Sequence, residues 1–146
     1  MQEIFGDLWA WYGRAIIAIT TGGQVGLKGT CSMPRGCARQ ARERFPDLPA
    51  RLGRLIRKHG NQVFDLGNGI VSFPVERTPF EVPDLRLIER SCLQLKALTD
   101  RNGWPLLILP RPGCGGGGLS WKEVRPLLKK HLDDRFRVIT LPEDAA

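Results

Sequence analysis

The chain has 146 residues, of which 42% are hydrophobic and 25% are charged, proportions that are ordinary for a soluble globular protein. This length is enough for one domain with its own hydrophobic core, so we expect residues 1–146 to form a single domain. The formal net charge of +7 favours anionic partners, either nucleic acid or a phosphorylated small molecule, but it does not indicate the fold.

The apolar pattern does not predict a membrane or secreted protein. The longest apolar stretch, residues 15–19, is far too short to cross a bilayer. The N-terminal residues MQEIFGDLW are acidic and lack the basic-then-apolar pattern of a signal peptide. We therefore expect a cytoplasmic protein with no membrane partner.

The cysteine pattern argues against a metal site or a disulfide framework. No pair of cysteines has the two-residue spacing of a zinc knuckle or a redox motif, and only two histidines could assist them. We expect free thiols, as in a reducing cytosol, with no bound metal and no cofactor. The cysteines are Cys31, Cys37, Cys92 and Cys114.

The first half of the chain predicts one buried strand followed by two helices. Residues 15–19 are continuously apolar and β-branched, which is typical of a strand buried on both faces. A glycine-bearing loop follows, and Pro34 suits the first turn of a helix that ends at residues 45–47. Asp47 is expected to cap a second helix over residues 49–59, which Gly60 ends.

The middle of the chain predicts a β-hairpin and a long helix. Residues 62–66 alternate weakly, Gly67-Asn68-Gly69 is a strong turn signal, and residues 70–73 return as the partner strand. Pro83 is expected to open a helix that ends at Asn102-Gly103.

The last third predicts two more strands around a capped helix. Residues 105–109 are fully apolar, and residues 135–141 form the final strand. Between them, Ser120 and Glu123 fit a capping box, although Pro126 lies inside the helix they would start. Because helices alternate with apolar strands, we expect an α/β fold, a three-layer α/β/α sandwich whose hairpin makes the central sheet mixed.

The segment LPRPGCGGGGLSW at residues 109–121 places a glycine-rich loop between a strand and a helix. Ligands of open α/β sheets lie at the carboxyl ends of strands, and glycine lets main-chain N–H groups approach a ligand closely. Such groups suit a phosphate or a diphosphate. The loop following residues 15–19 also leads into a helix, so two loops could clamp one ligand. The alternative is a surface loop in which glycine only permits a turn.

These motifs resemble those of macro domains, the modules that bind ADP-ribose. The resemblance covers nearly the whole chain, is most specific at residues 109–121, and is closest to the branch that includes the glycohydrolase releasing ADP-ribose from glutamate. The matching segments are Gly6-Asp7-Leu8, Ala15 to Thr21, Met33 to Ala38, Arg44-Phe45-Pro46, Ser72 to Val75, Leu109 to Gly115 and Gly118 to Trp121.

The resemblance implies a ligand-binding role for particular residues. Asp7 would accept a hydrogen bond from the adenine amino group, Leu8 would contact adenine through its backbone, and Ile139 or its neighbours would flank the ring. Thr20 and Thr21 would lie near the distal ribose.

It also implies two loops around the diphosphate. The first loop, over the diphosphate and distal ribose, would contribute Met33, Arg35, Gly36 and Cys37. The second loop, wrapped around the diphosphate, would contribute Gly113, Cys114, Gly115, Gly116 and Gly117.

Catalysis is a separate question, because the groups that the resemblance implies are missing. The glycohydrolase branch uses a lysine after the Phe-Pro strand and an aspartate in the second loop. This chain has Val75-Glu76 and Gly117 at those places, and neither can replace a nucleophilic lysine or a proton-handling carboxylate. Another hydrolytic branch has an asparagine after the first strand, where this chain has Thr20 to Gly23.

Three hypotheses follow from the sequence. The first is a module that binds ADP-ribose, free or attached to a macromolecule. The second is an ADP-ribosyl hydrolase acting on protein or nucleic acid, with Glu76 as the one acidic residue to nominate as base. The third is weak nucleic-acid contact through the arginines of residues 35–54, which should depend steeply on salt. Trp9, Trp11 and Tyr12 either pack together or stack on adenine.

Overall fold

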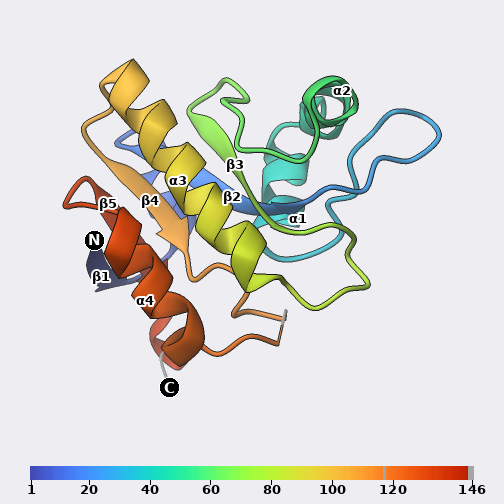
Figure 1. Cartoon of the computed structure of the whole chain (residues 1–146). Coiled ribbons are helices and arrows are strands. Elements are labelled where there is room, and N and C mark those ends of the chain that lie inside the picture. The colour runs from blue at the N-terminus through green and yellow to red at the C-terminus, as the bar shows by residue number, and fades with distance from the viewer. Residues whose placement is uncertain (117, 145–146) are drawn as a thin grey trace.

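The computed structural model describes residues 1–116 and 118–144. Its central element is a five-stranded sheet in the order β1-β5-β4-β2-β3, with helices on both faces (Figure 1). The elements in chain order are β1 (Gln2–Phe5), η1 (Leu8–Trp11), β2 (Ile16–Gly22), α1 (Gly36–Arg44), α2 (Leu48–His59), β3 (Ile70–Glu76), α3 (Leu85–Asn102), β4 (Leu107–Pro110), α4 (Trp121–His131), β5 (Phe136–Thr140) and η2 (Pro142–Asp144).

All strand pairs of this sheet are parallel, so the predicted mixed sheet is wrong. The expected hairpin survives only as an isolated antiparallel bridge between Asp65 and Val71 beside the turn. The Ser72 side chain explains the interruption: its Oγ accepts from Phe64 N–H at 2.9 Å and donates to the Gln62 carbonyl at 3.2 Å. Residues 62–66 therefore run beside β3 without forming a regular strand.

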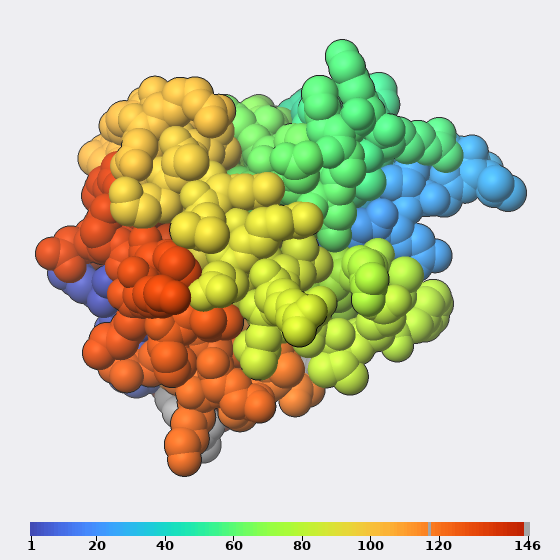
Figure 2. Space-filling view, in the orientation of Figure 1, coloured from blue at the N-terminus to red at the C-terminus, as the bar shows by residue number. Residues whose placement is uncertain are grey.

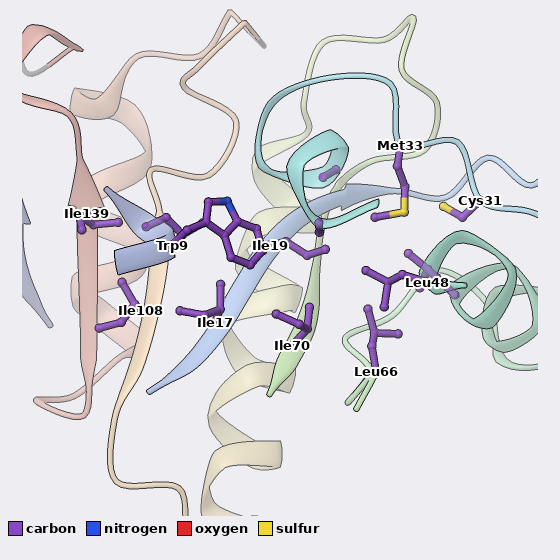
Figure 3. Packing of buried hydrophobic residues seen from close by; sticks show 14 residues of the cluster. Trp9, Ile17, Ile19, Cys31, Met33, Leu48, Leu66, Ile70, Ile108 and Ile139 are labelled. Carbon is purple, nitrogen blue, oxygen red and sulfur yellow. The ribbon is translucent and has the colours of Figure 1, made fainter. Parts of the chain in front are cut away.

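Two hydrophobic cores, one on each face of the sheet, make the three layers. Ile17 and Ile19 of β2 point to one face and Ala18 to the other, as the period-two pleat of a strand requires. The first core contains η1, α1 and α2 residues, and Figure 3 shows Trp9, Met33 and Leu48 packed there against β2 and β3. The second core joins the sheet to α3 and α4.

The local sequence signals account for most element boundaries. Ser120 and Glu123 form the predicted capping box, and α4 continues past Pro126 to His131. The helices expected from Pro34 and Pro83 begin two residues later, at Gly36 and Leu85, because the residues before them are extended. Asp47 precedes α2 but its carboxylate pairs with Arg51 instead of capping the helix.

The edge strand β1 has no counterpart in the predicted elements. It is short and mostly exposed, so it lacks the apolar run that marks the inner strands. It pairs with β5, which lies at the other end of the sequence, and Ile4 is in register with Ile139. This pairing places Asp7 and Leu8 at the carboxyl end of the sheet.

Outside the sheet, the loop between β2 and α1 projects from the body of the molecule, and its Leu27 is fully exposed (Figure 2). Among the aromatic residues near the N-terminus, Trp9 is buried and its indole N–H donates to Gln40 Oε1 at 2.8 Å, whereas Tyr12 is exposed. Across the described ranges, no helix has the length and apolar character needed to span a bilayer.

Candidate functional site

The candidate site lies at the carboxyl ends of β2 and β4, which are neighbours in the sheet. The connection after β2 leads to α1 and α2 on one face, whereas the connection after β4 leads to α4 on the other. Strands whose connections diverge in this way leave a crevice between their loops, the usual ligand position in open α/β sheets.

Two adjoining cavities occupy this crevice. Their volumes are about 680 Å³ and about 440 Å³, and they form one continuous cleft because they share lining residues. The shared residues come from the start of α1 and from the loop after β4: Cys37, Pro110, Arg111, Gly115 and Gly116.

The larger cavity contains the residues predicted for adenine. Asp7, Leu8 and Ile139 all line it. The Asp7 carboxylate caps η1, with Trp9 N–H donating to Oδ1 at 3.1 Å. This bond uses one oxygen of the carboxylate, so Oδ2 can accept from a ligand.

The smaller cavity contains the residues predicted for the distal ribose. Thr20 and Thr21 line it together with Arg35, Gly36 and Glu76. Thr21 is only 4% exposed and its Oγ1 is buried without a hydrogen-bond partner in the described structure. A buried hydroxyl without a partner is costly in free energy, so this cavity presents an unsatisfied polar group.

Two further side chains define the rim of the smaller cavity. Burial raises the pKa of the Glu76 carboxyl, an effect that the nearby Arg35 guanidinium opposes. Arg35 also donates to the Pro79 carbonyl at 2.8 Å, which ties the loop after β3 to the start of α1. A carboxylate and a guanidinium therefore face each other at this end of the cleft.

The middle of the cleft is rich in main-chain donors. Helix α1 begins there at Gly36, and no side chain from its N-cap residue satisfies its first N–H groups in the described structure. In the loop after β4, the N–H groups of Gly115 and Gly116 have no partner among the described residues. Donors at a helix start and in a bare loop suit an anion such as a diphosphate. The start of α4, in contrast, is occupied by its own capping box.

Two of the predicted site residues are not placed in the cleft. Met33 is 2% exposed and packs in the core beneath the first loop, and it lines neither cavity. Gly117 lies outside the described residues. Gly113 and Cys114 do reach the cleft, Gly113 in the smaller cavity and Cys114 in the larger.

The cleft thiols are poor nucleophiles in this arrangement. Burial raises the pKa of the Cys114 thiol to about 11 and also raises that of Cys37, whose sulfur contacts Thr20 N and Oγ1 at 3.4 Å and 3.3 Å. Both are therefore neutral at physiological pH, and the thiolate is the reactive form. Residues 1–116 and 118–144 contain no cluster of side chains able to hold a metal ion.

Sequence reasoning missed several polar residues of the cleft, among them Arg111 and Gln40. Arg111 belongs to the segment LPRPGCGGGGLSW, but the prediction for this segment rested on its glycines and gave Arg111 no role in the site. Gln40 lies one helical turn after Gly36. The local sequence does not predict its position in the cleft, because packing against β2 determines which face of α1 meets the cleft.

Comparison with known proteins identifies the fold. No family model and no curated protein sequence matches the chain. The macrodomain of Mycobacterium tuberculosis DarG is similar in structure, with a TM-score of 0.78, 22% identity and coverage of 97% of each chain. The macrodomain of Thermus aquaticus DarG gives a TM-score of 0.77 at 21% identity, with 96% of each chain covered.

A third structure carries a ligand in its description. Thermosipho africanus DarTG in complex with ADP-ribose matches with a TM-score of 0.78 and 20% identity, over 99% of this chain and 43% of that one. At these identities the likeness concerns the fold alone. The chain has the fold of a macrodomain.

Proposed function

We propose that the cleft binds ADP-ribose, free or attached to a macromolecule. The observation that carries the proposal is the order of groups along one continuous cleft. An adenine acceptor at Asp7 is followed by the main-chain donors of Gly36, Gly115 and Gly116, and then by the buried hydroxyl of Thr21. The structural similarity to a DarTG protein in complex with ADP-ribose supports the same ligand.

The dimensions of the cleft agree with an elongated nucleotide. Cavities of about 680 Å³ and about 440 Å³ that meet end to end fall in the size range of ligand pockets. A ligand that spans both would place its middle at the shared residues, where the donors lie. A mononucleotide would leave the Thr21 end empty.

Calorimetry with ADP-ribose, ADP, AMP and NAD tests the proposal. We expect ADP-ribose to bind most tightly, because ADP and AMP lack the distal ribose that would lie near Thr21, and NAD carries a bulky nicotinamide on that ribose. Absence of heat with ADP-ribose, on protein shown to be folded, would refute the proposal.

A second candidate function is hydrolysis of an ADP-ribosyl bond, and the position of Glu76 favours it. Its carboxyl lines the distal end of the cleft, and its burial raises the carboxyl pKa, as suits a general base. The mechanism must differ from that of the glutamate glycohydrolase branch, because Val75-Glu76 and Gly117 replace its lysine and aspartate.

Incubation with mono-ADP-ribosylated protein and ADP-ribosylated nucleic acid tests this second function. Release of ADP-ribose that falls at least tenfold in Glu76→Gln, with ADP-ribose affinity unchanged, supports a base at Glu76. Glu43→Gln is the matched control, because Glu43 is an exposed glutamate that pairs with Arg39 and does not line the cleft. Equal release by the Glu76→Gln variant would remove Glu76 from the mechanism.

Nucleic-acid contact through residues 35–54 remains a weaker proposal. Two of its arginines already pair with acids, Arg39 with Glu43 on the same helix and Arg51 with Asp47 just before α2. These pairs reduce the positive charge that the surface offers to phosphates. Binding to single-stranded oligonucleotides that does not weaken with added salt would contradict it.

A further inference from the structure

Arg111 has a distinct position among the charged residues of the cleft. It lines both cavities at their junction, whereas the other charged lining residues of the described structure lie toward one end or the other. Asp7 and Asp144 line only the larger cavity, and Arg35 and Glu76 line only the smaller one. The middle of the cleft thus combines uncharged main-chain donors with one positive side chain.

A fixed aromatic surface holds the Arg111 guanidinium. Its central carbon lies 5.0 Å from the centroid of the Trp121 ring, within cation–π range. The Trp121 indole N–H donates to Glu3 Oε1 at 2.8 Å, and Glu3 Oε2 accepts from Arg125 Nε at 2.7 Å. The stacking surface is therefore fixed by both β1 and α4, and Arg111 loses less side-chain entropy when a ligand binds.

The charge balance shows what this arginine can contribute. Main-chain N–H groups orient a diphosphate but carry no net charge, whereas the diphosphate diester of ADP-ribose carries two negative charges. A guanidinium presents a planar fork of donors that can bond two phosphate oxygens at once. Arg35 does not serve this purpose, because its guanidinium bonds the Pro79 carbonyl and faces Glu76 at the far end of the cleft.

We propose that Arg111 is a ligand-binding residue that pairs with the diphosphate and makes the cleft select diphosphate esters over monophosphate esters. This inference rests on the proposed ADP-ribose binding and adds the residue that determines phosphate selectivity. Trp121 is the positioning residue that keeps the guanidinium at the junction.

The test measures affinities of ADP-ribose, ADP and AMP for the full chain and for three variants. Arg111→Gln should weaken ADP-ribose and ADP by roughly tenfold or more, since a charge-assisted hydrogen bond contributes that much to affinity, and AMP by less than about threefold. Arg111→Lys keeps the charge without the planar fork and should fall between the wild type and Arg111→Gln. Lys129→Gln is the matched control: it removes an equal charge from an exposed residue of α4 that lies outside the cleft and outside the Glu3 network.

The outcomes separate this inference from the function on which it rests. Loss of diphosphate affinity in Arg111→Gln, with Lys129→Gln like wild type, supports the inference. Wild-type affinity in Arg111→Gln, or an equal loss for AMP and ADP, overturns it while leaving ADP-ribose binding in place. If the wild type binds no ADP-ribose, both fail. Thermal unfolding of each variant identifies a folding defect. If Arg111→Gln does not fold, the affinities of Arg111→Lys decide between these outcomes.

Discussion

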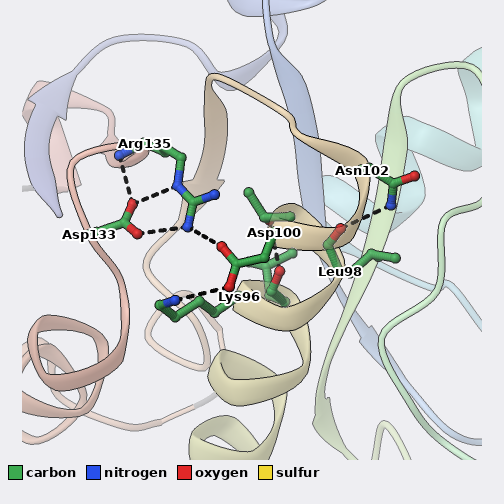
Figure 4. Close-up of polar contacts among 8 residues, drawn as sticks. Lys96, Leu98, Asp100, Asn102, Asp133 and Arg135 are labelled. Carbon is green, nitrogen blue, oxygen red and sulfur yellow. Dashed lines mark hydrogen bonds and ion pairs between the residues drawn. The ribbon is translucent and has the colours of Figure 1, made fainter.

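The two ends of the parallel sheet satisfy their polar groups in opposite ways. At the carboxyl end, the start of α1, the N–H groups of Gly115 and Gly116 and the Thr21 hydroxyl have no partner among the described residues. At the amino end, Arg135 bonds both Asp133 and Asp100, and Asp100 also accepts from Lys96 (Figure 4).

This difference indicates which end is available for binding. The Arg135 cluster ties the end of α3 to the segment before β5, and its charges satisfy one another. The carboxyl end leaves main-chain donors facing a cleft and a buried hydroxyl without a partner beside it, an arrangement that costs stability unless a ligand satisfies those groups. Substitutions of the carboxyl-end groups that face the ligand should therefore affect binding, whereas substitutions in the Arg135 cluster should affect stability alone.

The largest expected effect is that of Gly113→Ala, which should lower the free energy of unfolding by about 3 kcal/mol. Gly113 has a φ of +74°, and an added Cβ would lie 3.0 Å from both Leu119 Cδ1 and Pro83 Cβ. Urea denaturation measures the change. Gly115→Ala is the control, because its added Cβ meets nothing within 4 Å and its φ is not positive. Equal destabilisation of both variants would contradict this account.

The second effect concerns Asp7→Asn, which should weaken ADP-ribose binding by roughly tenfold, as expected for loss of a bond to a charged acceptor. Asparagine keeps the cap on η1, since its side-chain oxygen can accept from Trp9 N–H. Its amide group then faces the adenine amino group with a donor instead of an acceptor. Calorimetry and thermal unfolding together test this prediction, and a drop in stability as large as the drop in affinity would contradict it.

A smaller effect is expected for Ser120→Ala, at the boundary between cleft and scaffold. It removes the hydroxyl that accepts from Glu123 N–H, and loss of an N-cap costs about 1 kcal/mol. Ser120 lines the larger cavity as well. We expect urea denaturation to show the loss, with ADP-ribose affinity changed by less than about threefold, because capping leaves the hydroxyl no role in the proposed diphosphate site. A larger affinity loss would make Ser120 part of the binding site.

The smallest effect is that of Asp133→Asn at the amino end, at most about 1 kcal/mol, because the pair is exposed. Hydrogen bonds from Arg135 lower the pKa of the Asp133 carboxyl to about 2, below the unfolded value of about 3.9. The stabilisation is present above about pH 4 and is lost as the pH falls towards 2. Urea denaturation should show a difference from wild type at neutral pH that disappears in acid, with ADP-ribose affinity unchanged throughout.

Part of the site could be predicted from the sequence because its signals are local. A glycine loop between an apolar strand and a capped helix indicates close approach of main chain to a ligand, and the structure places Gly113, Gly115 and Gly116 at the cleft. Asp7, Thr20 and Thr21 also line it, consistent with the resemblance. Met33 shows where prediction from the sequence fails: it belongs to the first loop, but its side chain turns inward and packs in the core.

The sequence by itself determined the helices, the inner strands and the glycine turns, because periodicity, caps and positive φ are properties of neighbouring residues. Only the tertiary structure decided what depends on residues far apart. Pairing of β1 with β5 and the bonds of Ser72 made the sheet parallel throughout. Arg111 stacks on Trp121, and Trp121 is held by Glu3 from the opposite end of the sequence. This stacking places a cation where the two cavities meet.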